Sequence, residues 1–220
     1  MNEILDLFLH LPDHLRDFIS AHGTLVYGLL FLIIFCETGL VITPFLPGDS
    51  LLFAIGAIAA DPTSNLNIWI AAIILLVAAI LGDTVNYWIG RRFGGWMMRT
   101  FPKVVKPSHI EKTNEFFVRY GGKTIIIARF VPIVRTFAPF VAGSGEMDYR
   151  RFMFFNVIGA VLWVGLILPC GWFFGNIPIV KANFELVVLG IIAISVMPMV
   201  IEIARAKMAK KKDPESLPTD

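Results

Sequence analysis

The sequence predicts an all-α integral membrane protein, with about four transmembrane helices, two oppositely oriented re-entrant helical segments and an N-terminal interfacial helix. Three observations carry this prediction. The 220-residue chain is 56% hydrophobic and 16% charged, whereas a soluble domain is usually about 45–50% apolar and about 25% charged. Several apolar runs approach the roughly 20 residues that a helix needs to cross a bilayer. Two other apolar runs are interrupted by proline, glycine and charged residues.

Three regions follow from this pattern. Residues 1–22 mix apolar with acidic and basic side chains and are expected to form an amphipathic helix in the membrane interface. The membrane domain is expected to extend over 23–206, and 207–220 is expected to be a basic cytoplasmic tail.

The predicted full spans are the long apolar runs at 24–43, 66–90, 152–174 and 184–203. Between the second and third spans, residues 91–122 are polar and basic. Within this loop we expect a short amphipathic helix over 108–120, because Ser108 is followed three residues later by Glu111, as in a capping box.

The two predicted re-entrant segments lie near 44–60 and 123–145. Prolines and glycine break a helix, and the apolar run that follows the first break is too short to cross the membrane. Irregular backbone at this depth is tolerated only where it is buried in protein or lines a wet cavity. The interrupting residues are Pro44, Pro47, Gly48 and Asp49 in the first segment, and Arg129, Pro132, Arg135 and Pro139 in the second.

The distribution of Lys and Arg predicts the topology. Basic residues concentrate in 91–122, at Arg150 and Arg151, and in the tail, and such segments stay in the cytoplasm. Both termini are then cytoplasmic, and the re-entrant segments enter from opposite sides of the membrane. A local match, Pro44-Phe45-x-x-Gly48 with Pro139-Phe140-x-x-Gly143, also favours an inverted-repeat transporter, in which the site forms at broken helices near the midplane.

Five charged residues lie inside apolar segments: Glu37, Asp49, Asp83, Arg129 and Arg135. Each would cost about 2.5–3.5 kcal/mol at the bilayer centre, so we expect them to face protein, water or one another. Two arginines suit binding of a phosphate or carboxylate. Glu37 and Asp49 are expected to take up and release protons, because burial disfavours their charged form. The alternative is that these acids pair with the arginines only to hold the two re-entrant segments together.

Asp83 belongs to a helical pattern of its own. Asp83, Tyr87, Gly90 and Arg91 share one face of the second span, and Gly90 with Gly94 has the spacing that lets helices approach closely. We expect Asp83 to contact Arg91 or Tyr87 in a supporting role, and a direct role stays equally open.

Other classes of protein find little support. The basic fringe lacks the exposed aromatic residues of a nucleic-acid-binding face. No zinc-ligand spacing and no serine–histidine pairing within apolar sequence is present. We therefore expect no enzymatic activity, no metal and no cofactor.

The motifs resemble those of the DedA family of bacterial inner-membrane proteins, over about residues 20–205. The resemblance rests on Glu37-Thr38-Gly39, on Pro44 to Leu52, on Gly82-Asp83 with Tyr87, Gly90 and Arg91, and on Arg129-Phe130-x-Pro132-x-x-Arg135. It implies the VTT domain shared with SNARE-associated Golgi proteins, and transport linked to the proton motive force. It also implies that the essential acids and arginines of the family fall on Glu37, Asp49, Arg129 and Arg135.

Some members of that family are described as flippases that recycle undecaprenyl phosphate, so the resemblance implies a flippase of an anionic lipid that supports envelope homeostasis. Membrane lipids and protons are then the partners. Two alternatives stay open: a proton-coupled transporter of small solutes or cations, and a membrane scaffold without transport. The sequence leaves open the substrate, the coupling ion, the oligomeric state (a homo-oligomer included) and which acid pairs with which arginine.

Overall fold

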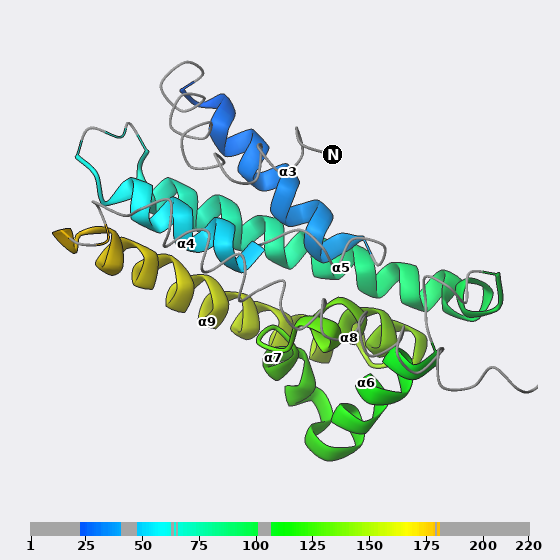
Figure 1. Ribbon diagram of the computed structural model, residues 1–220. Coiled ribbons are helices and arrows are strands. Elements are labelled where there is room, and N and C mark those ends of the chain that lie inside the picture. Colours follow the sequence, from blue (N-terminus) through cyan, green and yellow to red (C-terminus); the bar gives the residue numbers. More distant parts are fainter. Residues whose placement is uncertain are drawn as a thin grey trace, which may run out of the picture.

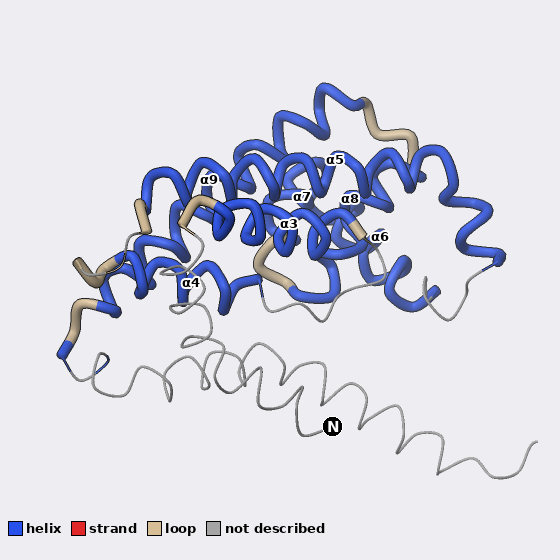
Figure 2. The backbone as a smooth tube through the Cα atoms, turned by 90° about the horizontal axis from the view of Figure 1, so that it is seen from above, coloured by secondary structure: helices blue, strands red, loops and turns tan. Residues whose placement is uncertain are grey.

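The computed structural model describes residues 23–40, 48–62, 64, 66–100, 107–178 and 180, and every regular element in these ranges is a helix (Figure 2). The predicted all-α class is therefore confirmed for this part of the chain. The expected interfacial helix, the span at 184–203, the tail, and the prolines Pro44 and Pro47 lie outside the described residues.

The first half contains α3 (Leu25–Gly39), α4 (Gly48–Ala59) and α5 (Ile68–Thr100) (Figure 1). α4 is a separate short helix of 12 residues, as the broken pattern predicted. α5 differs from the prediction, because it continues as a helix to Thr100 instead of ending at residue 90. No proline follows until Pro102, and the arginines in between are good helix formers, so polarity alone does not end this helix.

The second half contains α6 (Pro107–Tyr120), the 3₁₀ turn η1 (Gly121–Lys123), α7 (Thr124–Ala128), α8 (Pro132–Ser144) and α9 (Tyr149–Gly175). The amphipathic helix expected over 108–120 is thus confirmed as α6. The helix is also broken within 123–145, as the sequence predicted, since α7 and α8 are separate helices. Val131 is extended and Pro132 opens α8, which is the position where a helix accepts proline and where the residue before it avoids helical backbone.

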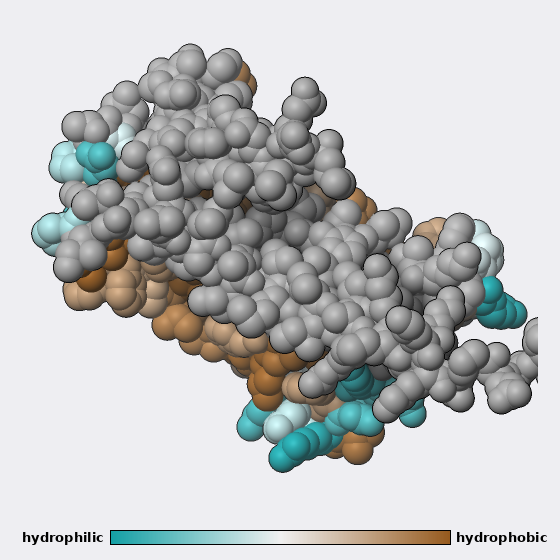
Figure 3. Space-filling view, viewed as in Figure 1, coloured by the Kyte–Doolittle hydropathy of each residue, from teal (hydrophilic) through white to brown (hydrophobic). Residues whose placement is uncertain are grey.

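α5 and α9 are both long and apolar enough to cross a membrane, with mean hydropathies of 2.4 and 2.1 over their most apolar windows. Only 33% and 39% of these windows are buried, so most of the apolar surface faces outward. Large side chains such as Trp69, Ile73 and Phe154 are exposed. Apolar surface follows α9, while hydrophilic groups gather toward the α6–η1 end (Figure 3). Such a surface suits lipid rather than water.

α5 and α9 run in opposite directions, and each has one short helix as its main neighbour: α8 packs on α5, and α4 packs on α9 (Figure 1). α3 packs against α5 as well. The first turns of α4 and α8 meet, since Asp49 and Arg135 are 3.0 Å apart. From this meeting point the two short helices run toward opposite ends of the α5–α9 pair (Figure 1).

Glycines make the contact between α4 and α9 close. A Cβ atom at Gly56 would lie 2.2 Å from the carbonyl oxygen of Leu168, and one at Gly171 would lie 2.2 Å from that of Phe53. The two backbones therefore touch directly, as in small-residue interfaces of membrane helices.

The contact between α8 and α5 repeats this arrangement. A Cβ atom at Gly143 would lie 2.0 Å from the carbonyl oxygen of Tyr87, and one at Gly90 would lie 2.1 Å from that of Phe140. Phe140-x-x-Gly143 on α8 thus makes the same pair of contacts as Phe53-x-x-Gly56 on α4.

This correspondence corrects the register expected from the sequence. Gly143 matches Gly56, whereas the sequence match had paired it with Gly48. Gly48 lies in a different environment, where a Cβ atom would come within 1.8 Å of Oε2 of Glu37. The structure therefore supports an internal repeat of a short and a long helix, but the Pro-Phe-x-x-Gly match does not define it.

Candidate functional site

Arg135 lies at the centre of a buried ionic cluster built from three helices. Its Nη2 is 3.1 Å from Oε1 of Glu37 on α3, and its Nη1 is 3.0 Å from Oδ1 of Asp49 on α4. The side chains of Arg135 and Glu37 are 12% and 8% exposed, and that of Asp49 is 40% exposed. The sequence had left the pairing open; the structure gives both acids to one arginine.

Gly48 explains how Glu37 fits against the first turn of α4. Its backbone N–H donates a hydrogen bond to Oε1 of Glu37 at 3.2 Å, and any larger residue would occupy the carboxylate's space. The unpaired N–H groups at a helix start favour a negative charge. The start of α4 at Gly48 therefore positions the carboxylate of Glu37 against this helix, and it places the charged residue Asp49 beside Arg135.

Trp163 of α9 completes the cluster, and the sequence analysis missed it. Its indole N–H donates to Oδ1 of Asp49 at 2.7 Å, and its ring centre is 4.3 Å from the guanidinium carbon of Arg135. The residue is fully buried. The one signal in the sequence was its place in the middle of an apolar span, since tryptophans of membrane helices usually lie near the interfaces.

Arg129 belongs to a second, neighbouring cluster. Its Nη2 is 2.5 Å from Oδ2 of Asp83 and donates to Oδ1 of Asn156 at 2.7 Å. Asn156 in turn donates to the carbonyl of Ile80 at 3.1 Å. Asp83 therefore pairs with Arg129, and the expectation that it contacts Arg91 or Tyr87 was wrong. Helical spacing had suggested neighbours on α5, but the buried charge is neutralised across the helix interface.

The two clusters are close to each other. The guanidinium carbon of Arg129 is 5.8 Å from the centre of the Trp163 ring, the same ring that Arg135 approaches. Asn86 links the helices around them, because its amide donates to the carbonyls of Thr38 on α3 and Thr136 on α8 at 3.1 and 3.0 Å. Asn86 and Asn156 were both absent from the sequence-based site, since neutral amides give no strong hydropathy signal.

Tyr87 and Arg91 occupy supporting positions, as expected, but they contact each other. Arg91 donates to the Tyr87 hydroxyl at 2.7 Å, and this hydroxyl donates to the carbonyl of Met147 at 2.5 Å. The Tyr87 ring stacks on Phe152, with centroids 4.5 Å apart. The pair thereby anchors the start of α9 to α5, while Arg91 itself is exposed.

Pro139 lies inside α8, four residues after Arg135. Proline has no N–H to donate, so the backbone carbonyl of Arg135 receives no helical hydrogen bond from it. The first turn of α8 is therefore less firmly held than an ordinary helical turn, at the residue that joins the two acids.

Several buried atoms of these clusters have hydrogen-bonding capacity to spare. In the described part of the chain, the buried side-chain atoms without a hydrogen bond are Glu37 Oε2, Asn86 Oδ1, Arg129 Nε and Arg135 Nη2. The last of these lies at ion-pair distance from Glu37 but without hydrogen-bond geometry. Buried polar atoms are normally paired, and unsatisfied ones concentrated around intramembrane charges mark a functional site.

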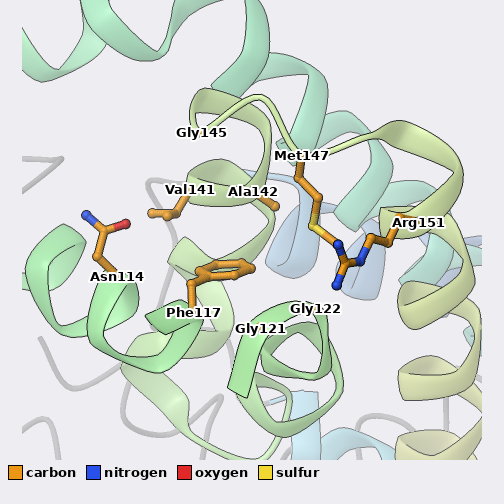
Figure 4. A pocket seen from close by; sticks show the side chains of 9 residues that line it. All are labelled: Asn114, Phe117, Gly121, Gly122, Val141, Ala142, Gly145, Met147 and Arg151. Atoms are coloured by element: carbon orange, nitrogen blue, oxygen red, sulfur yellow. The ribbon is translucent and has the colours of Figure 1, made fainter. Parts of the chain in front are cut away.

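A cavity of about 320 Å³ lies apart from these charges (Figure 4). It is lined by Asn114, Phe117, Gly121, Gly122, Val141, Ala142, Gly145, Met147 and Arg151. None of its lining residues belongs to the ionic clusters, so this cavity and the concentrated charge are two separate features of the molecule.

The VTT domain matches residues 46–173 of this chain. The chain is 54% identical to Protein DedA of Escherichia coli (strain K12), over 94% of each chain. An uncharacterized membrane protein of Mycobacterium tuberculosis (strain ATCC 25618 / H37Rv) is 39% identical, over 90% of this chain and 88% of the relative.

The inner membrane protein YqjA of Escherichia coli (strain K12) is 35% identical, over 70% of each chain. No solved structure shows significant similarity to this chain. The relatives' names and the outward apolar surface of α5 and α9 agree on a membrane protein of the bacterial inner membrane. The chain belongs to the DedA family of VTT-domain membrane proteins.

Proposed function

We propose that this chain is a transporter that moves an anionic lipid, such as undecaprenyl phosphate or a phospholipid, across the inner membrane at the expense of the proton motive force. It is a flippase that supports envelope homeostasis, not an enzyme. The observation that carries the proposal is the position of Arg135, which is buried between two carboxylates at ion-pair distance and keeps an unsatisfied N–H group.

Arg135 is the phosphate-binding residue of this mechanism. A guanidinium offers paired donors to a phosphate, and the two carboxylates occupy those donors when no lipid is bound. Protonation of Glu37 and Asp49 removes their negative charge, so that they release Arg135 to the lipid. Deprotonation restores the ion pairs and expels the phosphate. Proton movement and lipid movement are coupled because they compete for one guanidinium.

We propose a role for Arg129 that differs from the substrate binding that the sequence suggested. Its Nη2 is engaged by Asp83 and Asn156, so it is less free to bind the headgroup than Arg135. We assign it the role of a fixed positive charge near the Trp163 ring, with its unsatisfied Nε available to a phosphate oxygen once a lipid has entered.

The proposed topology follows from the helix arrangement and the basic residues. α4 and α8 are re-entrant helices that enter from opposite sides and meet at their first turns near the midplane. Four spans cross the membrane, and both termini are cytoplasmic. The divergence of α4 and α8 from the Asp49–Arg135 contact supports this topology (Figure 1), as does the concentration of basic residues at the α6 end.

A proton-coupled transporter of small cations is the second candidate. One observation favours it: the Asp49 side chain is 40% exposed while its arginine partner is 12% exposed, so a cation would reach the carboxylate first. A scaffold without transport would use the same ion pairs only as staples. In that case the exchange Glu37→Arg with Arg135→Glu restores function, whereas a transporter loses it because the phosphate ligand has moved.

The test is translocation of undecaprenyl phosphate in proteoliposomes with an imposed proton gradient. Wild type is compared with Arg135→Lys, which keeps the charge but loses the paired donors. Arg150→Gln is the matched control, because Arg150 is exposed at the start of α9. We expect wild type and the control to move the lipid and Arg135→Lys to move little. Correctly folded wild-type protein that moves no lipid would refute the proposal and favour the cation transporter or the scaffold.

A further inference from the structure

The cavity in Figure 4 has the composition of a binding site for an amphiphile. Its walls come from α6, η1, the last turns of α8 and the start of α9. Most of this lining is apolar, with Phe117, Val141, Ala142 and Met147 around it. The only charged residue in the lining is Arg151, and the one polar amide is that of Asn114.

Arg151 reaches into this cavity. Figure 4 shows its guanidinium extending from α9 into the space between Met147 and Gly122. No carboxylate pairs with it among the residues that the structure describes. Asp148 lies close in sequence, but Oδ1 of its carboxylate accepts from the backbone N–H groups of Arg150 and Arg151 and caps α9. The guanidinium therefore has donors available to an anion.

The size of the cavity defines which part of an amphiphile fits. Ligand pockets usually range over about 300–1,000 Å³, and this one, at about 320 Å³, holds a headgroup and the first carbons of a chain but not a whole lipid. The neighbouring surface suits a membrane interface, because the apolar Val118 is 90% exposed on the amphipathic α6, next to Arg119. Acyl chains leaving the cavity would thus meet an apolar surface.

We propose that this cavity is a second lipid site, which binds the phosphate headgroup of an anionic membrane lipid through Arg151. The assignment of a lipid as the ligand rests on the proposed function; the cavity, its lining and the unpaired guanidinium do not. The cavity and the ionic cluster share helix α8. Val141, in the cavity lining, is six residues after Arg135, which is about 9 Å along the helix axis. The cavity is therefore placed to load a lipid beside the translocation site.

Equilibrium binding to the purified full-length chain in nonionic detergent tests this proposal. The probes are dioctanoyl phosphatidylglycerol, dioctanoyl phosphatidylcholine and glycerol 3-phosphate. We expect the anionic lipid to bind tightest, and Arg151→Gln to weaken its binding about tenfold while Arg150→Gln leaves it unchanged. Asn114→Trp fills the cavity from an exposed position on α6 and is expected to weaken binding with no change in the melting temperature.

Three outcomes would overturn the proposal. Equal affinity of wild type and Arg151→Gln removes Arg151 as the ligand. Equal binding of the zwitterionic lipid removes the charge selectivity, and equal binding of glycerol 3-phosphate makes the cavity a site for free anions. Arg135→Lys separates this proposal from the flippase mechanism, because we expect it to abolish translocation and to preserve binding at the cavity. Arg151-dependent binding by a wild-type protein that moves no lipid would refute the flippase alone.

Discussion

The guanidinium carbon of Arg135 lies 4.3 Å from the centre of the Trp163 ring. The same indole donates its N–H to Asp49, one of the two carboxylates at ion-pair distance from this arginine. The ring contact uses the face of the guanidinium, whereas carboxylate and phosphate oxygens bind at its N–H edges. Trp163 is therefore placed to hold Arg135 while the anions at its edges exchange, as the proposed mechanism requires.

Trp163→Phe tests this role, because it keeps an aromatic face and removes the N–H donor. We expect lipid transport to slow on the order of tenfold, as a hydrogen bond to a charged group contributes about 1.5–3 kcal/mol. Trp163→Leu removes the ring as well and is expected to slow transport further. Transport rates are measured in proteoliposomes, with melting temperatures as the control for folding. Wild-type rates in both variants would show that the indole has no part in transport.

Arg129 and Asp83 are expected to matter for stability more than for binding. Arg129→Gln leaves Asp83 buried without its cationic partner, and breaking a buried pair in this way costs about 3–5 kcal/mol. The double variant Arg129→Gln with Asp83→Asn removes both charges and is expected to recover most of that loss. Thermal unfolding in detergent measures the effect, and Arg92→Gln, at an exposed position of α5, is the control. Equal destabilisation by the single and double variants would contradict the pairing.

The repeated glycine contacts predict matched effects in the two halves. Gly56→Ala and Gly143→Ala would each place a methyl group within 2.2 Å of a backbone oxygen, so each is expected to lower stability by about 1–3 kcal/mol through overpacking. Gly28→Ala and Gly165→Ala are the controls, because a Cβ atom there meets nothing within 4 Å and alanine favours a helix. Loss of stability in only one of the two test variants would argue against the repeat.

Proton coupling is expected to depend on Glu37. Glu37→Gln mimics the protonated acid permanently, so lipid movement through this variant is expected to lose its response to a pH gradient while some gradient-independent movement remains. The measurement is the transport rate in proteoliposomes with and without the gradient. If transport by Glu37→Gln kept its full response to the gradient, the coupling role would belong to Asp49 instead.

Hydropathy and helix-breaking residues were enough to predict the separate short helices and the charged residues at their first turns. Proline and glycine stop a helix for local reasons, so the start of α8 at Pro132 and the separation of α4 from α3 were readable from the sequence. Local polarity was a poorer guide, since α5 continues through Arg91 and Arg92 to Thr100.

The sequence did not reveal which acid pairs with which arginine. The cost of burying Asp83 and Arg129 shows that each needs a partner, but the choice of partner depends on which helices pack together. The same limit hid Trp163 and Asn156, whose roles come only from contacts with other helices. It also produced the wrong repeat register, because a match of three residues carries less information than the reciprocal backbone contacts around Gly56 and Gly143.

In the proposed mechanism, a carboxylate and a lipid phosphate compete for Arg135. The most direct measurement is the affinity of a short-chain polyprenyl phosphate for Glu37→Gln and for the parent protein, both in the Arg151→Gln background so that the cavity on α6 contributes little. Neutralising the competitor 3.1 Å from the guanidinium is expected to tighten binding by about tenfold, about 1.4 kcal/mol. Unchanged or weaker binding to Glu37→Gln would contradict this mechanism, because Glu37 would then not be competing with the phosphate.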